Sequence, residues 1–172
     1  LRHGIRTVQL GERGLRVNGQ PCKLQGVGAE IFTETDARRW HDEGINLVLM
    51  PARDDTIELL QISDRFGLFV LGRIEQPHHW PRWPLACQRH PSYLGCVLTA
   101  GVDNVGARLA VPGLLGAEVA ADGTAPAGRF DFVVMPSGQP ATLMMPTILQ
   151  VASAEAPPAP SNALLGWVRQ SH

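Results

Sequence analysis

Charged side chains stand within, or shortly after, several short apolar runs of this chain. They are Glu30, Arg53, Arg73, Glu75, Asp103, Glu118 and Glu155. If these runs are parallel strands, such residues meet at one end of the sheet, where acid–base chemistry or ligand binding takes place. Glu118 and Glu155 could form a pair of carboxyl groups in which one gives a proton and the other attacks carbon. Loop carboxylates are more often solvated surface, and Glu118, inside an apolar run, could instead be a buried partner of an arginine.

A second candidate site is an aromatic segment, QPHHWPRWP, at residues 76–84. Trp80 and Trp83 could stack on the C–H face of a sugar, held in place by the neighbouring prolines. The favoured alternative is that both rings close one end of the fold over its core. His78 and His79 make a poor metal site, because adjacent residues rarely point at one ion and no third ligand is indicated. We expect no metal and no cofactor.

Eight apolar runs must carry these residues. They begin at Cys22, Asn46, Gly67, Tyr93, Leu114, Asp131, Thr147 and Ala163. Continuous rather than alternating runs are typical of parallel strands covered on both faces, and eight strands can close a barrel. The sequence therefore predicts an α/β fold, a reduced (β/α)₈ TIM-type barrel over residues 21–172. An N-terminal β-hairpin within residues 1–20, with its strands in 7–17, precedes it.

Helix signals are confined to the first half of the chain. Thr35 and Asp36 predict the start of a helix that Gly44 ends, and Asp55 with Glu58 predicts another that Gly67 ends. Later connections, such as residues 121–129 and 153–163, are rich in Pro and Gly, and only 102–111 resembles a helix. The outer helices are therefore expected to be mostly lost in the second half. Such bare strands would need a cover from a second subunit or from missing domains of a larger chain.

Composition narrows the functional classes. The 172 residues carry a net charge of −1, so neither a nucleic-acid partner nor a polyanion is expected. No apolar stretch approaches the ~18–20 residues of a membrane span. A barrel of this type usually takes about 250 residues, so the chain is expected to be a piece of a larger soluble protein of unknown compartment. The three cysteines lack metal-ligand spacing, and Cys22 and Cys96 are expected to be buried free thiols.

Four ordered segments resemble glycoside hydrolase family 2, the β-galactosidase and β-glucuronidase family. The first is GIRTVQL with LRVNGQPCKLQGV (4–10 and 15–27), similar to the passage from a sandwich domain into the first barrel strand. The second is DARRWHDEGINLVLMP (36–51), and the third is ISDRFGLFVLGRI (62–74). The fourth is HPSYLGCVLTAG (90–101), similar to the fourth barrel strand.

The resemblance implies a retaining glycosidase whose carboxylates are absent here. The family's acid/base Glu aligns with Gly101, and its nucleophile, at the end of the seventh strand, aligns with Val151 or Ala152. Gly101 cannot carry a proton, and without a nucleophile no covalent intermediate forms.

Other family site residues are also replaced. The motif G-V-N-R-H at the first strand is replaced by residues 26–30, which end in Glu30, and the second-strand Arg aligns with Leu49. The third-strand D-E pair aligns with Gly72 and Arg73. Loss of all of them together is typical of a site no longer in use.

The leading hypothesis is a non-catalytic structural or carbohydrate-binding module of a larger protein. The candidate binding residues are Trp80, Trp83, Glu30, Arg73 and Glu75. The alternative is an active hydrolase of β-glycosides with relocated carboxylates, Glu118 and Glu155. A carbohydrate ligand and a homo-oligomer or further domains are the expected partners.

Overall fold

The computed structural model describes residues 6–11, 14–99, 113–119, 130–136, 148–152 and 164–170. A small antiparallel sheet comes first, made of β1 (Val8–Gly11), β2 (Gly14–Val17) and β3 (Gln20–Cys22) in that order. The predicted hairpin corresponds to β1 and β2. Cys22 pairs with Leu15 in this sheet, so the first barrel strand begins at Leu24 and not at Cys22 as expected.

Eight parallel strands follow, each paired with the next along the chain. They are β4 (Leu24–Gly28), β5 (Leu47–Pro51), β6 (Phe69–Ile74), β7 (Tyr93–Leu98), β8 (Leu114–Glu118), β9 (Phe132–Pro136), β10 (Ile148–Ala152) and β11 (Leu164–Gln170). Because β11 also pairs with β4, the sheet closes on itself.

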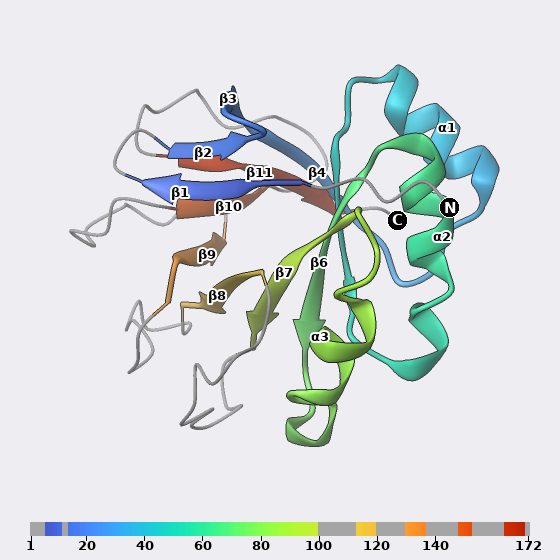
Figure 1. Cartoon of the computed structure of the whole chain (residues 1–172), viewed down its shortest axis with the longest axis vertical. Coiled ribbons are helices and arrows are strands. Elements are labelled where there is room, and N and C mark those ends of the chain that lie inside the picture. Colours follow the sequence, from blue (N-terminus) through green and yellow to red (C-terminus); the bar gives the residue numbers. More distant parts are fainter. Residues whose placement is uncertain are drawn as a thin grey trace.

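The helices in the described residues all lie between β4 and β7, on the outside of the sheet (Figure 1). They are α1 (Glu34–Asp42), α2 (Leu59–Phe66) and α3 (Arg82–Cys87), with short 3₁₀ turns at Asp54–Thr56 and Pro77–His79. Closed parallel strands with few helices define a partial α/β barrel. Within the same residues, no helix has the length and apolar character needed to cross a membrane.

The predicted helix starts need correction. Helix α1 begins after Thr33, whose hydroxyl accepts from the backbone N–H of Asp36 at 3.3 Å while the Asp36 carboxylate accepts from the backbone N–H of Thr33 at 3.0 Å. This reciprocal capping places Thr35 inside the first turn. Helix α2 begins at Leu59, because Asp55 lies in a 3₁₀ turn. Its predicted end is confirmed, since Gly67 has the left-handed φ of 70° that favours glycine.

Helix α3 was not predicted, because Pro84 lies within it and Pro81 directly precedes it. Pro84 lies in the first turn of α3, where a backbone N–H has no partner within the helix. Proline is therefore tolerated there, and the aromatic segment of residues 76–84 is partly helical rather than an open loop.

Alternating side chains divide the core into two layers. Leu47, Leu49 and Leu71 belong to a cluster inside the barrel, whereas Val48 and Val70 belong to a second cluster, under the helices. Side chains fill the space beside two glycines of the inner cluster. A Cβ on Gly26 would lie 2.9 Å from Val168 Cγ2, and a Cβ on Gly116 would overlap the ring of Phe132. Continuous burial along the strands follows from cover on both faces.

The strands after β7 are less bare than expected. Leu115, Ala117, Val133 and Met135, on the central strands of the second half, are all buried within the chain. Where side chains are described in β8 and β9, the barrel does not present the open apolar face from which a covering partner was expected. Oligomerisation therefore remains a prediction.

Polar side chains tie the strands together at their amino-terminal ends. Asn46, just before β5, accepts from the backbone N–H of Gln25 at 2.8 Å and donates to the carbonyl of Lys23 at 2.9 Å. The Asp64 carboxylate of α2 contacts His90 Nδ1 at 2.7 Å and accepts from the backbone N–H of Ser92 at 2.9 Å. These contacts lie at the face of the barrel that serves stability.

We predict that Asp64→Ala lowers the free energy of unfolding by about 1–3 kcal/mol, because it leaves the partly buried N–H of Ser92 and the ring of His90 without their acceptor. Urea unfolding followed by circular dichroism measures the change. Asp42→Ala, at an exposed helical position of α1, is the matched control and should stay within about 0.5 kcal/mol of wild type. Equal losses in both variants would contradict a special role for Asp64.

The three cysteines are free, and two of them are deeply buried. Burial raises the pKa of both Cys87 and Cys96 to about 12. Cys22 is only half-buried, contrary to expectation, because it lies on β3 at the edge of the small sheet. Its pKa is also raised by burial, and Arg6 opposes that shift.

We predict that a disulfide reagent such as Ellman's reagent modifies one thiol per folded chain at pH 8 and three after denaturation. The thiolate is the attacking form, so protonated and inaccessible Cys87 and Cys96 should be protected. Cys22→Ser should remove the fast-reacting thiol. Rapid reaction of a second thiol in the folded protein would be inconsistent with this core.

Candidate functional site

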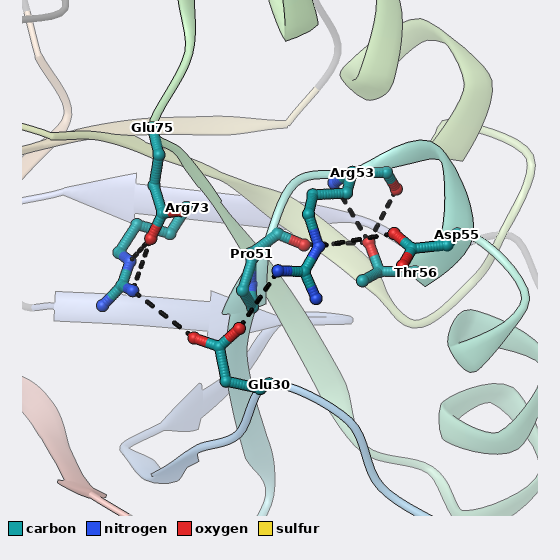
Figure 2. Close-up of polar contacts among 7 residues, drawn as sticks. All are labelled: Glu30, Pro51, Arg53, Asp55, Thr56, Arg73 and Glu75. Carbon is teal, nitrogen blue, oxygen red and sulfur yellow. Dashed lines mark hydrogen bonds and ion pairs between the residues drawn. The ribbon is translucent and has the colours of Figure 1, made fainter.

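A cluster of charged side chains lies at the carboxyl ends of β4, β5 and β6 (Figure 2). Glu30 follows β4, Arg53 follows β5, Arg73 lies within β6, and Glu75 directly follows β6. Parallel neighbouring strands end on the same side of a sheet, which is why residues 20 or more positions apart meet here. In barrels of this type that side carries the active site. We call this cluster, with Asp55, the mouth cluster.

Two arginines alternate with three carboxylates in the mouth cluster. Arg73 Nε donates to Glu75 Oε1 at 2.8 Å, and Arg73 Nη2 lies 3.9 Å from Glu30 Oε1. Arg53 Nη1 donates to the other oxygen of Glu30 at 3.2 Å. Arg53 Nε is 3.4 Å from Asp55 Oδ1, within ion-pair distance but without hydrogen-bond geometry. The cluster is thus a chain of ion pairs with a formal charge of one negative unit.

Exposure decides how strongly these pairs hold. The side chains of Arg73 and Arg53 are 29% and 37% exposed, whereas that of Glu30 is 65% exposed. Ion pairs open to solvent contribute only about 0–1 kcal/mol each. The mouth cluster therefore adds little to stability and is open to a polar ligand.

The backbone of Arg53 is fixed by residues behind it. The Thr56 hydroxyl accepts from the Arg53 N–H at 3.2 Å and lies 2.8 Å from the carbonyl oxygens of both Pro51 and Arg53. The indole N–H of Trp83 donates to the Arg53 carbonyl at 3.1 Å. Both side chains are buried, so the point from which the arginine projects is rigid.

Trp83 belongs to the core. It is 0% exposed, and its ring lies edge-on to Tyr93 with centroids 5.8 Å apart. It also covers Gly72, where a Cβ would overlap the ring. No ring face is left for a sugar, and the packing interpretation of Trp83 is the one the structure favours. Trp80 is half-buried and packs against the same cluster, so part of its surface remains accessible.

Other candidates lie on later barrel strands. Glu118 is partly buried at the end of β8, the fifth barrel strand, opposite Val134. Val151 and Ala152 end β10, the seventh barrel strand, and Val151 pairs with Pro136 and Val168. Three further candidates lie outside the described residues: Gly101, Asp103 and Glu155.

Sequence analysis missed the roles of Asp55 and Thr56 at this site. Asp55 is predicted with Glu58 to begin a helix, where short polar residues are common, and Thr56 is given no role. The sequence does carry one signal for their roles. Asp55 and Thr56 follow Arg53 by two and three residues, shortly after the end of a strand.

Comparisons with known proteins show the fold. No protein-family model and no curated protein sequence matches the chain. Among solved structures, β-glucuronidase of Parabacteroides merdae superposes with a TM-score of 0.61 at 14% identity, over 78% of this chain and 22% of that one. The same enzyme with glycerol in its active site gives 0.63 at 12% identity, over 91% and 28%. β-Glucuronidase 3 of Bacteroides uniformis gives 0.54 at 14% identity, over 77% and 23%.

The chain therefore has a glycoside-hydrolase-like barrel fold. It spans only about a quarter of the length of these solved relatives. At such low identity the likeness concerns the fold, and function has to be argued from the mouth cluster itself.

We predict that Gly72→Ala destabilises the protein by about 1–3 kcal/mol, because the new methyl group overlaps the ring of Trp83 in a filled core. Thermal or urea unfolding reports the loss. Gly11→Ala is the matched control, since a Cβ there meets nothing within 4 Å, and its effect should be within about 0.5 kcal/mol. A tolerated Gly72→Ala would mean that Trp83 is free to move out of the core.

Proposed function

We propose that this chain is a degenerate glycoside hydrolase family 2-like barrel that serves as a structural or carbohydrate-binding module of a larger protein. The barrel is reduced, in that its outer helices are mostly lost after the fourth strand. The glycoside-hydrolase-like fold supports the family assignment. Gly101, Val151 and Ala152, at the positions where the family has its catalytic carboxylates, support a non-catalytic role.

One observation carries this proposal most directly. Two carboxylates of the mouth cluster, those of Glu30 and Glu75, both form an ion pair with Nη2 of Arg73. A retaining glycosidase holds the anomeric carbon between its two carboxyl groups, roughly 5–5.5 Å apart. Here a guanidinium group occupies the space between them. The arrangement suits recognition of a polar ligand better than double displacement.

The same groups support binding of a carbohydrate. Guanidinium groups donate and carboxylates accept hydrogen bonds, which matches the mixed character of sugar hydroxyls. Trp80 remains partly accessible among the candidate residues and could add contact with an apolar sugar face. The proposed ligand surface therefore consists of the mouth cluster with Trp80, and Trp83 is left out because it is buried.

The alternative is a working hydrolase of β-glycosides with relocated carboxylates. The observation that favours it is Glu118, which ends the fifth barrel strand on the side where such enzymes act. Its proposed partner is Glu155. This alternative predicts turnover and not only binding.

We predict that the purified protein shows no turnover of nitrophenyl β-galactoside or β-glucuronide above the uncatalysed rate. Loss of the family's acid/base alone removes about 10²–10⁴-fold of catalysis. Release of nitrophenol, followed by absorbance, is the measurement. Turnover abolished by Glu118→Gln would overturn the non-catalytic assignment and establish the alternative.

The binding half of the proposal has its own test. In a glycan-binding titration followed by nuclear magnetic resonance, Arg73→Ala should weaken sugar binding about tenfold or more, because hydrogen bonds to a charged group are lost. Arg39→Ala, on the exposed face of α1, is the matched control and should bind as wild type does. Absence of binding to every sugar would leave only the structural role.

A further inference from the structure

Thr56 holds the turn after β5 with a single hydroxyl group. Its Oγ1 accepts from the backbone N–H of Arg53 at 3.2 Å and lies 2.8 Å from two carbonyl oxygens, those of Pro51 and Arg53 (Figure 2). A hydroxyl carries one hydrogen, so it donates fully to only one of these carbonyls at a time. Thr56 and Pro51 are both buried, which makes solvent a poor source of a second donor. Another donor from the protein therefore decides how the turn is held.

Trp83 provides that donor. The Arg53 carbonyl oxygen accepts from the Trp83 indole N–H at 3.1 Å and from the backbone N–H of Thr56 at 3.1 Å. A carbonyl oxygen has two lone pairs, and these two donors fill both of them. The Thr56 hydroxyl is then left to donate to Pro51, at the end of β5. Without the indole N–H, one lone pair on the Arg53 carbonyl opens, and the hydroxyl can turn to it instead.

The same indole ring contacts the neighbouring strand. A Cβ on Gly72 would lie 2.2 Å from Trp83 Cζ3, so the ring packs directly against β6 one residue before Arg73. One side chain of α3 therefore contacts both of the strand ends that carry the arginines of the mouth cluster. Trp83 is 0% exposed, so any effect that it has on a ligand must pass through these neighbours.

We propose that Trp83 is a positioning residue of the mouth cluster. Its indole N–H commits the Thr56 hydroxyl to Pro51. This fixes the backbone from which Arg53 reaches Glu30. The inference rests on the proposed ligand-binding function, and it names a residue that sets ligand affinity without touching the ligand. The physical reason is that a side chain already held in place loses less conformational entropy when a ligand binds.

Four variants separate hydrogen bonding from packing. Thr56→Val keeps the shape of the side chain and removes the hydroxyl, whereas Thr56→Ser keeps the hydroxyl. Trp83→Phe removes the indole N–H together with part of the ring. Trp40→Phe is the matched control, because Trp40 is 4% exposed in the same core cluster but packs against Phe32 on the side of α1.

Two quantities are measured for each variant. They are the order of the Arg53 Nε–H bond, from nuclear magnetic resonance relaxation, and the affinity for methyl β-D-galactoside as the probe sugar. Trp83→Phe and Thr56→Val should make Arg53 more mobile and weaken binding of the probe about two- to tenfold, which is the cost of ordering one more side chain. Thr56→Ser and Trp40→Phe should match wild type in both. A role in packing alone would lower the free energy of unfolding and leave the Arg53 signal unchanged.

The other outcomes bear on separate claims. Unchanged order of Arg53 in Thr56→Val or Trp83→Phe would overturn the inference, and if one of these variants does not fold, the other decides. Equal effects in Trp40→Phe would also overturn it, because general loosening of the core would then explain them. Greater mobility of Arg53 with unchanged affinity would overturn it and leave the proposed function in place. Failure of wild type to bind the probe would count against the carbohydrate-binding function, and the order of Arg53 would still decide the positioning role.

Discussion

The carboxylate of Asp64 links α2 to the start of β7, and much of the first half of the barrel depends on that link. One oxygen contacts His90 Nδ1 and the other accepts from the Ser92 backbone, while the Ser92 hydroxyl donates to the carbonyl of Leu60 in α2 at 3.3 Å. Ser92 in turn accepts from Val70 in β6 through its carbonyl. These contacts fix α2, β6 and β7 relative to one another, independently of the side chains of the mouth cluster.

Asn46 likewise links neighbouring strands, at the start of β5. Its amide group satisfies one backbone donor and one acceptor next to β4, and its carbonyl accepts from Phe69 at the start of β6. A side chain with both a donor and an acceptor can thus bind two backbone groups at once. Asn46, Asp64, His90 and Ser92 all lie in the segments that resemble glycoside hydrolase family 2. The resemblance to that family is therefore carried in part by residues that hold the strands together.

At the carboxyl ends of the strands, the family's polar site residues are not matched in this sequence. Leu49, aligned with an arginine of that family, is buried among the inner side chains and strengthens the core. The charged groups of the mouth cluster form exposed ion pairs whose formal charges sum to one negative unit. A site of this kind has polar groups, a rigid base under Arg53 and access to solvent. The proposed recognition of a polar ligand rests on these features.

The sequence by itself determined the elements with a strong local signal. Apolar runs bounded by turn residues located the parallel strands, and Gly67 marked the end of α2 because only a residue without a side chain adopts its left-handed conformation readily. The same patterns placed Glu30, Arg53, Arg73 and Glu75 near strand ends. Local patterns could not show α3, whose prolines are acceptable only because they fall at or before the first turn of a helix.

Only the tertiary structure decided which of these residues touch. Strand register brought Arg73 level with Pro51, so that two arginines from separate strands face one glutamate. Packing placed Trp83 over Gly72, which turned a candidate sugar-stacking residue into a core residue that also holds the backbone of Arg53. Both outcomes depend on contacts between residues far apart in the chain, and spacing along a sequence carries no information about the distance between such side chains in a closed barrel.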